Sequence, residues 1–335
     1  MMTQRAAPDR NLALDLVRTT EAAALAAARW VGRGDKNAAD QAAVDAMRHM
    51  FNSVPFDGIV VIGEGEKDEA PMLFNGERVG TGGPPSMDIA VDPLEGTELT
   101  ARGEANALAV VGVAERGTVF DPGPCVYMEK LVTGPEGAAV IDITRPITDN
   151  VRMVAKARGM EVGDITVVIL DRPRNADAIR AIREMGARVQ LITHGDTAPA
   201  LSAARPGTGV DIVFGIGGSP EGVITAAAMK CLGGAIQARL WPRDDDERAA
   251  AEAQGIDVSR VLTTNDIVSG EDVFFACTGV TDGVLVQGVR YSAGAATTES
   301  LVMRSRSGTT RRIRSEHRWD KLRDVAGASY LGETL

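Results

Sequence analysis

Acidic residues gather in two short runs whose spacing suggests metal-ion chemistry. Residues 63–69 are Gly-Glu-Gly-Glu-Lys-Asp-Glu, and residues 92–97 are Asp-Pro-Leu-Glu-Gly-Thr. Carboxylates a few ångströms apart repel each other and raise each other's pKa values unless a cation lies among them. All-oxygen ligands favour Mg²⁺ or Mn²⁺ over zinc, and two such ions about 3.5–4 Å apart can hold the attacking and leaving oxygens of a phosphoryl transfer. Either run alone is compatible with a solvated turn, but together they predict a metal site.

The second run has the sequence of a tight turn. Its proline biases Asp92 toward an extended backbone, and the turn can then bring Glu95 back to the same point. Gly96 allows the backbone to approach a ligand closely. Thr97 precedes a predicted short helix over residues 98–102, whose first amides would face an anion. One turn therefore offers metal ligands, a hydroxyl and a phosphate site.

Buried strands and amphipathic helices are predicted around these runs. Short apolar segments at residues 58–63, 87–92 and 107–114 are typical of buried strands, and the first two end on acidic residues. Apolar residues at helical spacing predict helices over about 12–30 and 43–51. The carboxylates are therefore expected at the ends of buried strands.

The second half of the chain alternates between strands and helices. Strands are predicted at residues 165–170, 188–192 and 211–215, with helices between them and a further helix at 221–232. This order is typical of βαβ units around a mainly parallel sheet. The change of pattern suggests a domain boundary near residues 159–164.

Length and charge restrict the function further. The chain has 335 residues, more than the roughly 250–300 at which a single core stops growing, so we expect two domains, residues 1–162 and 163–335. The net charge is −10, from 36 Lys and Arg against 46 Asp and Glu, which argues against a nucleic-acid-coating role. No apolar run approaches the roughly 18–20 residues of a membrane span, so no membrane partner is expected.

Cysteine and histidine residues are few and scattered. Cys125, Cys231 and Cys277 are odd in number and far apart, so they predict buried thiols in a reducing cytosol rather than disulfides or a zinc site. His49 and His317 have no evident partners in the sequence, and we expect them to be structural or exposed.

Two other motifs suggest different functions and are weaker. The glycine-rich turn from Gly215 follows a strand, but the third glycine of a dinucleotide-binding motif would fall on Pro220. A turn that brings Glu221 and backbone amides to a ligand needs no nucleotide. The basic stretch 304–314 alternates around a Ser-Gly pair, which is typical of a hairpin with a solvated face.

Several longer motifs resemble one known family. The run at 92–97 resembles the Asp-Pro-hydrophobic-Asp-Gly-Thr signature of the lithium-sensitive, metal-dependent phosphatases, which include inositol monophosphatase. The segments 32–37, 63–72 and 215–222 narrow the resemblance to bacterial class II fructose-1,6-bisphosphatase, over about residues 12–318. The resemblance implies an α/β fold, a layered α/β/α/β/α sandwich of the sugar phosphatase (inositol monophosphatase-like) type.

The resemblance also implies roles for individual residues. The implied metal ligands are Asp40, Glu64, Asp92, Glu95 and Glu221. Asp68 and Thr97 would help to activate the attacking water, with Lys36 and Glu66 in support. The implied substrate-binding residues are Glu95, Gly96, Thr97, Tyr127, Arg174, Asn175, Ala176, His194, Gly195, Asp196 and Gly218.

Some of these positions also have simpler explanations. Lys36 and Asp40 are spaced as a surface pair on a helix. Tyr127 lies in an alternating strand and is compatible with a core position, and Arg174 is compatible with an ordinary surface arginine. Only the resemblance favours functional roles for them.

The activity that the resemblance implies is hydrolysis of the 1-phosphate of fructose 1,6-bisphosphate, a step of gluconeogenesis, with Mg²⁺ or Mn²⁺. We expect a cytoplasmic homo-oligomer, dimer or tetramer, that acts on a small sugar bisphosphate. Two positions depart from the family pattern, since His is common where Asn175 stands and Asp where His194 stands. Both lie in the sugar-binding stretch, so a bifunctional fructose-1,6-/sedoheptulose-1,7-bisphosphatase and a non-catalytic sugar-phosphate sensor stay as alternatives.

Overall fold

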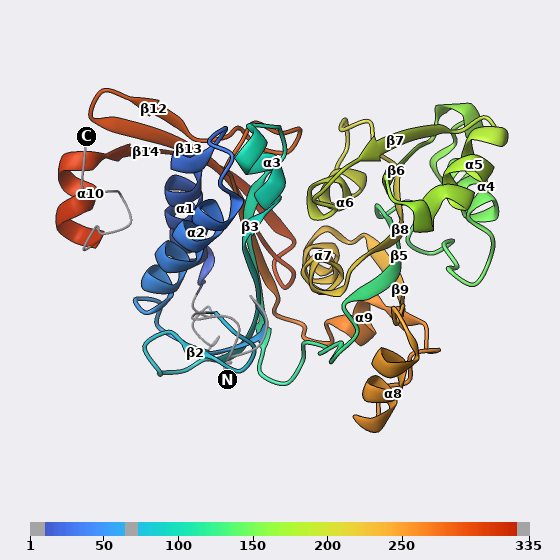
Figure 1. Cartoon of the computed structure of the whole chain (residues 1–335), viewed down its shortest axis with the longest axis horizontal. Helices are drawn as coiled ribbons and strands as arrows, with labels where there is room; N and C mark the ends of the chain where they lie inside the picture. Colours follow the sequence, from blue (N-terminus) through green and yellow to red (C-terminus); the bar gives the residue numbers. More distant parts are fainter. Residues whose placement is uncertain (1–10, 64–72, 327–335) are drawn as a thin grey trace, which may run out of the picture.

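Helices and sheets alternate in layers across the molecule (Figure 1). The computed structural model describes residues 11–63 and 73–326. Helices α1 and α2 cover the outer face of one sheet, α6 and α7 lie between the two sheets, and α4 and α5 cover the far face of the second. This order confirms the predicted α/β/α/β/α sandwich.

The first sheet has the strand order β12-β13-β11-β4-β3-β1-β2, with β14 paired to β13. Its strands are β1 (Asp57–Ile62), β2 (Arg78–Val79), β3 (Ser86–Glu95), β4 (Leu108–Glu115), β11 (Phe274–Gly279), β12 (Arg290–Ser292), β13 (Ala295–Arg304) and β14 (Thr309–Arg318). The hairpin predicted around the Ser-Gly pair is the β13–β14 connection, which is confirmed.

The second sheet has the order β10-β9-β5-β8-β6-β7. Its strands are β5 (Tyr127–Thr133), β6 (Thr166–Leu170), β7 (Arg188–Ile192), β8 (Ile212–Gly218), β9 (Ala235–Leu240) and β10 (Leu262–Thr263). The helices of the described chain are α1 (Ala13–Ala27), α2 (Lys36–Phe51), α3 (Thr97–Arg102), α4 (Ile147–Arg158), α5 (Ala176–Glu184), α6 (Thr197–Ala203), α7 (Ser219–Leu232), α8 (Asp245–Ala253), α9 (Thr264–Ile267) and α10 (Trp319–Ala326).

Helix α7 forms the centre of the core between the sheets. Val223 and Ile224 are fully buried in one cluster with Val110 of β4 and Leu301 of β13. A Cβ at Gly112 in β4 would lie only 2.9 Å from the Cβ of Ala227, so this glycine lets the helix lie close to the sheet. Because α7 is apolar on nearly all sides, it can be buried between two sheets.

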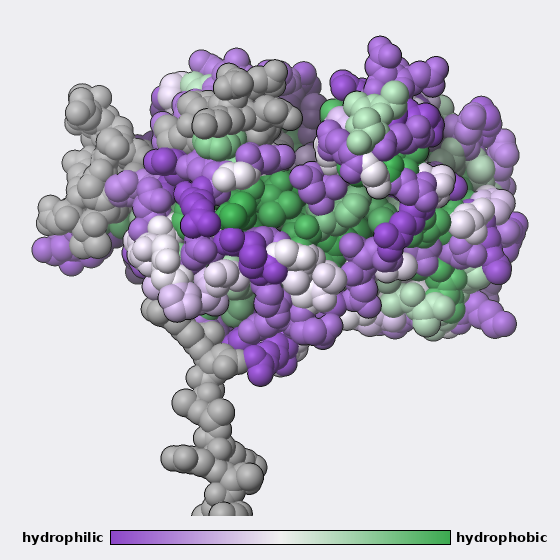
Figure 2. All heavy atoms as spheres, turned by 90° about the horizontal axis from the view of Figure 1, so that it is seen from below, coloured by the Kyte–Doolittle hydropathy of each residue, from purple (hydrophilic) through white to green (hydrophobic). Residues whose placement is uncertain are grey.

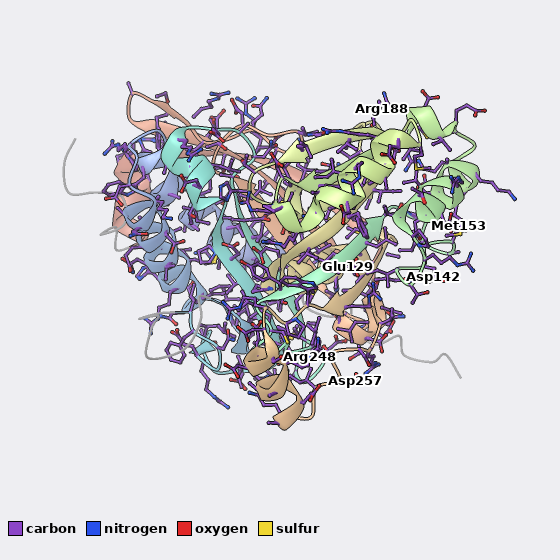
Figure 3. All side chains as sticks on the ribbon, turned by 45° about the vertical axis from the view of Figure 1, so that its right-hand side comes forward. Glu129, Asp142, Met153, Arg188, Arg248 and Asp257 are labelled. Atoms are coloured by element: carbon purple, nitrogen blue, oxygen red, sulfur yellow. The ribbon has the colours of Figure 1, made fainter. Side chains whose placement is uncertain are left out.

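The second sheet is mixed rather than mainly parallel. Strands β6, β7 and β8 are parallel, as the βαβ pattern predicted, but β5 pairs antiparallel with both β8 and β9. Glu129 of β5, labelled in Figure 3, lies on this sheet. Its carboxylate is 2.5 Å from the guanidinium of Arg239 in the neighbouring antiparallel strand β9. The expectation of a mainly parallel sheet was wrong for β5, β9 and β10, because their partners come from distant parts of the chain.

Sheet membership divides the chain differently from a boundary at residues 162 and 163. Strand β5 and helix α4 precede residue 162, yet β5 belongs to the second sheet and α4 covers its far face. Strands β11 to β14 follow residue 163, yet they complete the first sheet. The chain therefore crosses between the sheets twice.

The surface of the molecule mixes hydrophilic and hydrophobic side chains. In the face seen from below, hydrophobic residues reach the surface in the middle, surrounded by hydrophilic ones (Figure 2). Among the helices of the described residues, none combines the length and apolar character needed to cross a bilayer.

Candidate active site

An acidic cavity of about 380 Å³ lies where the end of β3, the start of α7 and the loop after β7 meet. Its lining comprises Asp40, Gly63, Val91, Asp92, Leu94, Glu95, Gly96, Thr97, His194, Gly195, Pro220 and Glu221. Four carboxylates predicted as metal ligands are therefore brought together from three distant segments. Glu64, Glu66 and Asp68 lie outside the described residues, so their predicted roles stay predictions.

The turn after β3 places two of these carboxylates. The pairing register between β3 and β4 shifts between Asp92 and Glu95, which marks the irregular end of the strand. The Asp92 carboxylate accepts the N–H of Leu94 at 3.0 Å, and this bond closes the turn. Gly96 has φ +90°, a left-handed conformation that favours glycine, and Thr97 begins α3 directly after it.

Glu95 is the most constrained carboxylate of the cavity. It is 3% exposed, and its Oε1 accepts the N–H of Thr197 at 2.8 Å. Its buried Oε2 has no hydrogen-bond partner among the residues that the structure describes. Burial, together with the nearby charges of Asp196 and Glu221, raises the pKa of Glu95 to about 8. A bound cation would provide the missing partner and reverse this destabilisation of the carboxylate.

Glu221 and Asp40 complete the acidic wall. Glu221 lies in the first turn of α7, and a Cβ at Gly218 would overlap its carboxylate, so the glycine leaves room for the carboxylate in its present position. Burial raises the pKa of Glu221, and Lys130 opposes this shift. Asp40 lies on α2, and burial raises its pKa as well. Burial disfavours the charged form of each of these carboxylates. A divalent cation bound among them would stabilise the charged forms, so such a group of carboxylates is typical of a metal site.

Several buried polar atoms near the cavity have no hydrogen-bond partner in the part of the chain that the structure describes. The buried atoms without a hydrogen bond include Glu95 Oε2, Asp196 Oδ1, Thr197 Oγ1 and Ser219 Oγ. Buried polar atoms are rarely left unsatisfied, so such a group suggests that a ligand or ion belongs here. Within residues 11–63 and 73–326, no three His, Cys, Asp or Glu side chains are close enough to enclose an ion by themselves. The all-oxygen donor set and the orphaned Glu95 oxygen nevertheless fit Mg²⁺ or Mn²⁺.

His194 and Gly195 lie at the side of the cavity and continue into a second hollow. This hollow of about 340 Å³ shares both residues with the acidic cavity and is also lined by Leu99, Glu104 and Gln190. Burial, and secondarily the charge of Arg172, lowers the pKa of His194. His194 is therefore placed to contact a ligand larger than a phosphate group.

Other residues predicted to bind the substrate lie outside the cavity lining. The Arg174 guanidinium stacks 4.4 Å from the centre of the Tyr127 ring, and its Nε donates to the carbonyl of Ile216 at 3.1 Å. The Asn175 amide donates to the Leu170 carbonyl at 3.0 Å and accepts the Ile216 N–H at 2.9 Å, so it joins β6 to β8.

The remaining predicted residues are placed by their elements. Ala176 begins α5, and Gly218 ends β8 beside Glu221. Lys36, at the start of α2, lies 3.8 Å from the Glu98 carboxylate. The roles of these residues in substrate binding stay predictions.

Sequence reasoning missed two residues that organise the site. Lys130 is 3% exposed and lies 2.5 Å from Asp196 Oδ2, and Thr197 holds Glu95 through its backbone. In a strand, residues two apart point to the same face, so Lys130 shares a face with the apolar Met128 and Val132. This alternation could have predicted that the lysine faces inward.

The chain was compared with protein families and with curated proteins. The family model described as bacterial fructose-1,6-bisphosphatase, glpX-encoded, matches residues 10–317. Similar curated proteins include the fructose-1,6-bisphosphatase 1 class 2 of Escherichia coli strain K12 and the fructose-1,6-bisphosphatase class 2 of Shigella flexneri. Each is 46% identical over 325 residues, which cover 93% of this chain and 96% of the relative. These matches show that the chain belongs to the bacterial, glpX-encoded class 2 fructose-1,6-bisphosphatase family.

Proposed function

We propose that this chain hydrolyses the 1-phosphate of fructose 1,6-bisphosphate in the acidic cavity, giving fructose 6-phosphate and inorganic phosphate. Family membership supports the reaction. The observation that supports the place is Glu95, which lines the cavity, is 3% exposed and has one carboxylate oxygen without a partner in the described part of the chain. The reaction belongs to gluconeogenesis.

The cofactor we propose is Mg²⁺ or Mn²⁺, held by Asp40, Asp92, Glu95 and Glu221 together with Glu64. A bound divalent cation would polarise the phosphoryl group and acidify water. The chain's own carboxylates orient the cation, and their negative charges would otherwise repel the substrate phosphate. Binding of metal and binding of substrate are therefore expected to support each other.

The residues around the carboxylates handle the phosphoryl group and the water. Thr97 and Gly96 line the cavity between the carboxylates, where they can contact phosphate oxygens. Asp68 and Thr97 would orient the attacking water, and the Asp68 carboxylate would accept one of its protons. The water oxygen bonds to phosphorus as the bond from phosphorus to the sugar oxygen breaks. The sugar oxygen takes up a proton from solvent, to which Asp68 returns the one that it accepted. No covalent enzyme intermediate forms.

The sugar and the second phosphate extend away from the carboxylates. His194 and Gly195 continue the cavity wall, and we expect them to contact the sugar. Arg174 and Tyr127 lie at the ends of β6 and β5 in the second sheet, and we assign the distal phosphate to Arg174. A guanidinium suits phosphate because it presents paired donors in one plane.

The setting of the enzyme follows the same reasoning. Cys125, Cys231 and Cys277 are buried and free, which supports a reducing cytoplasm. We also expect a homo-oligomer, dimer or tetramer, and light scattering of the purified protein measures this directly.

A substrate panel tests the proposed function. Phosphate release is measured from fructose 1,6-bisphosphate, sedoheptulose 1,7-bisphosphate and inositol 1-phosphate, with Mg²⁺, Mn²⁺ or a chelator present. We expect metal-dependent release from fructose 1,6-bisphosphate, with fructose 6-phosphate identified by phosphoglucose isomerase. Substrate binding without phosphate release would indicate a sensor, and fructose 1-phosphate as product would contradict the proposed orientation of the substrate.

A further inference from the structure

Lys130 is a buried cation with no role in the reaction described above. It lies in β5 with a side chain only 3% exposed, and the described cavity lining includes no residue of β5. A buried ammonium is unfavourable unless it is paired and hydrogen-bonded. Its partners therefore indicate what the side chain does.

The lysine joins two backbone segments that are far apart in the sequence. Its Nζ lies 2.5 Å from Asp196 Oδ2 and donates to the carbonyl oxygen of Gly218 at 3.0 Å. Asp196 belongs to the loop between β7 and α6, and Gly218 ends β8. The ammonium thus holds the β7–α6 loop against the end of β8.

Each of these segments contacts a proposed metal ligand that lies on a neighbouring element, Glu95 on β3 and Glu221 on α7. Asp196 precedes Thr197, whose N–H donates to Glu95 Oε1 at 2.8 Å. Gly218 precedes α7, and its Cα is so close to the Glu221 carboxylate that a Cβ would overlap it. A change in the distance between the two segments would therefore change the distance between Glu95 and Glu221.

The space around the lysine fits it closely. A Cβ at Gly217 would overlap Asp196 Oδ2 and lie 3.0 Å from Lys130 Nζ. A Cβ at Gly222 would lie 3.2 Å from the Cδ of Lys130. Two glycines thus leave room for the side chain, and the ion pair has little freedom to move.

We propose that Lys130 is a positioning residue for metal binding, which holds the β7–α6 loop to the end of β8 so that Glu95 and Glu221 are arranged before an ion arrives. This inference rests on the proposed function, because it concerns the metal affinity of the same site. Preorganised ligands bind more tightly since less ordering is needed on binding.

A positioning role and a purely electrostatic role of Lys130 predict opposite changes in Mn²⁺ affinity when the lysine is replaced. If the ammonium acted only through its charge, Lys130→Met would remove a repelling cation and Mn²⁺ would bind more tightly. If it positions the carboxylates, the same change weakens binding. We expect Mn²⁺ to bind about tenfold or more weakly to Lys130→Met.

Calorimetric titration of Mn²⁺ into the metal-free full-length protein measures this. The double variant Lys130→Met/Asp196→Asn restores the charge balance without the tie, and we expect it to bind Mn²⁺ as weakly as the single variant. Lys230→Met is the matched control, since this lysine near the end of α7 is 13% exposed and pairs with Glu271 and Asn265. The control is expected to bind Mn²⁺ like the parent. Unchanged or tighter binding by Lys130→Met, or recovery in the double variant, would overturn the inference.

A second variant covers the case in which Lys130→Met does not fold. Gly217→Ala pushes the ion pair apart without changing any charge, and we expect Mn²⁺ binding to weaken at least about threefold. Unchanged Mn²⁺ affinity in this variant would also overturn the inference. Absence of Mn²⁺ binding by the parent protein would instead contradict the proposed function, so the two failures can be told apart.

Discussion

One carboxylate oxygen of Glu95 accepts the Thr197 N–H, and the other has no partner among the described residues. Burial and neighbouring carboxylates raise the pKa of Glu95 to about 8. A fold that keeps such a group at the end of β3 loses stability unless a ligand binds to it. Asp92, in the same turn, is fixed through the Leu94 N–H at 3.0 Å. Both observations favour a preformed site for a cation over a solvated turn.

The first prediction concerns Asp92. Asp92→Asn keeps the size of the side chain but removes a charged metal ligand, so we expect kcat for fructose 1,6-bisphosphate to fall by at least about a hundredfold. Steady-state kinetics with saturating Mn²⁺ measure this. Asp177→Asn, at a carboxylate 92% exposed on α5, is the control and should keep parental activity. Near-parental activity of Asp92→Asn in a folded protein would remove this residue from the metal site.

The second prediction concerns Arg174. If its guanidinium holds the distal phosphate, Arg174→Ala should raise KM for fructose 1,6-bisphosphate by roughly tenfold or more, equivalent to about 1.5–3 kcal/mol for a lost charged hydrogen bond. Hydrolysis of p-nitrophenyl phosphate, which has no second phosphate, should change little. An equal loss on both substrates would argue instead that the change disturbs Tyr127 and the fold around it.

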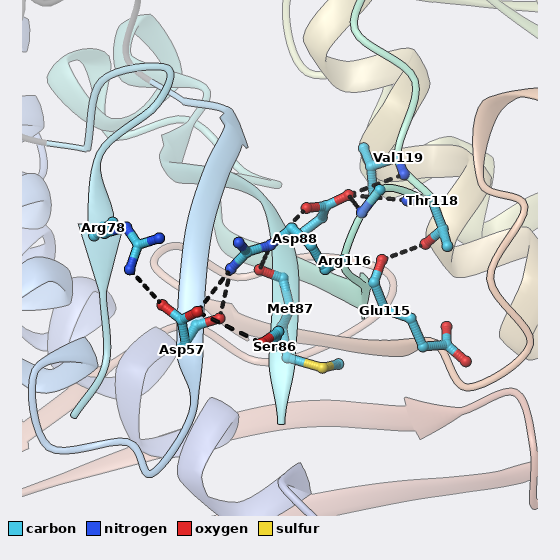
Figure 4. A network of polar contacts seen from close by, with 10 residues as sticks. Asp57, Arg78, Ser86, Met87, Asp88, Glu115, Arg116, Thr118 and Val119 are labelled. Atoms are coloured by element: carbon cyan, nitrogen blue, oxygen red, sulfur yellow. Dashed lines mark hydrogen bonds and ion pairs between the residues drawn. The ribbon is translucent and has the colours of Figure 1, made fainter. Parts of the chain in front are cut away.

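At the scale of secondary-structure elements, the other end of β3 is fixed by a buried carboxylate. Asp88 is 3% exposed, and its Oδ2 accepts the N–H groups of Gly117, Thr118 and Val119 at 2.7, 3.0 and 3.3 Å. Arg116 lies 3.2 Å from Asp88 Oδ1 and donates to the Asp57 carbonyl at 2.7 Å (Figure 4). This network joins the starts of β1 and β3 to the end of β4, and so fixes the strand that carries Asp92 and Glu95.

The third prediction follows from this network. Asp88→Ala leaves three amide N–H groups and the Arg116 guanidinium without their acceptor, so we expect the free energy of unfolding to fall by about 3–5 kcal/mol. Urea denaturation measures it, with Asp177→Ala as an exposed control. A loss below about 1 kcal/mol would show that water or another group satisfies these donors.

Local patterns in the sequence predicted most elements, because apolar runs bounded by glycine and proline correctly marked β1, β3, β4 and the β6–α5–β7 unit. The turn that ends β3 was also predictable from its proline and Gly96, which has φ +90°. Contacts between residues far apart in the sequence could not be predicted in this way. His317 was expected to lack partners, but Thr298 lies 2.9 Å from its Nε2, since β13 and β14 bring them together. Likewise, no local pattern could show that Lys130 would meet Asp196.

At the scale of the whole molecule, strands β11 to β14 return to the first sheet, where β13 forms hydrogen bonds with β14 and with α1. Thr298 of β13 donates to Glu21 of α1 at 3.1 Å, and its Oγ1 shares a hydrogen bond of 2.9 Å with Nε2 of His317 in β14. A chain that passes to the second sheet and returns places α7, with Glu221, between the two sheets and against β3. The active site is therefore built by the global topology rather than by one half of the chain.

The fourth prediction uses this network to give a pH dependence. Burial lowers the pKa of His317 below its ordinary 6.5, with Glu21 opposing the shift. Between the lowered value and 6.5 the unfolded chain binds more protons at this site, so the contribution of His317 to stability falls as the pH drops below about 6.5 and is unchanged above it. Glu95, whose pKa is raised to about 8, acts in the opposite direction, because its folded state binds more protons below that pH. Glu95 is present in both the parent and His317→Gln, so the difference between their melting temperatures isolates the histidine. We expect the parent to lose melting temperature relative to His317→Gln as the pH drops from 8 to about 5.5. Parallel curves for the two proteins would show that other groups cause the pH dependence.

Anomalous diffraction from crystals grown with Mn²⁺ and inorganic phosphate tests the central claim most directly. The account predicts a manganese peak bonded to the free Oε2 of Glu95 and to Asp92 or Glu221, at about 2.0–2.2 Å, with phosphate beside Thr97. A manganese peak only outside the acidic cavity, with Glu95 Oε2 still without a partner, would contradict it.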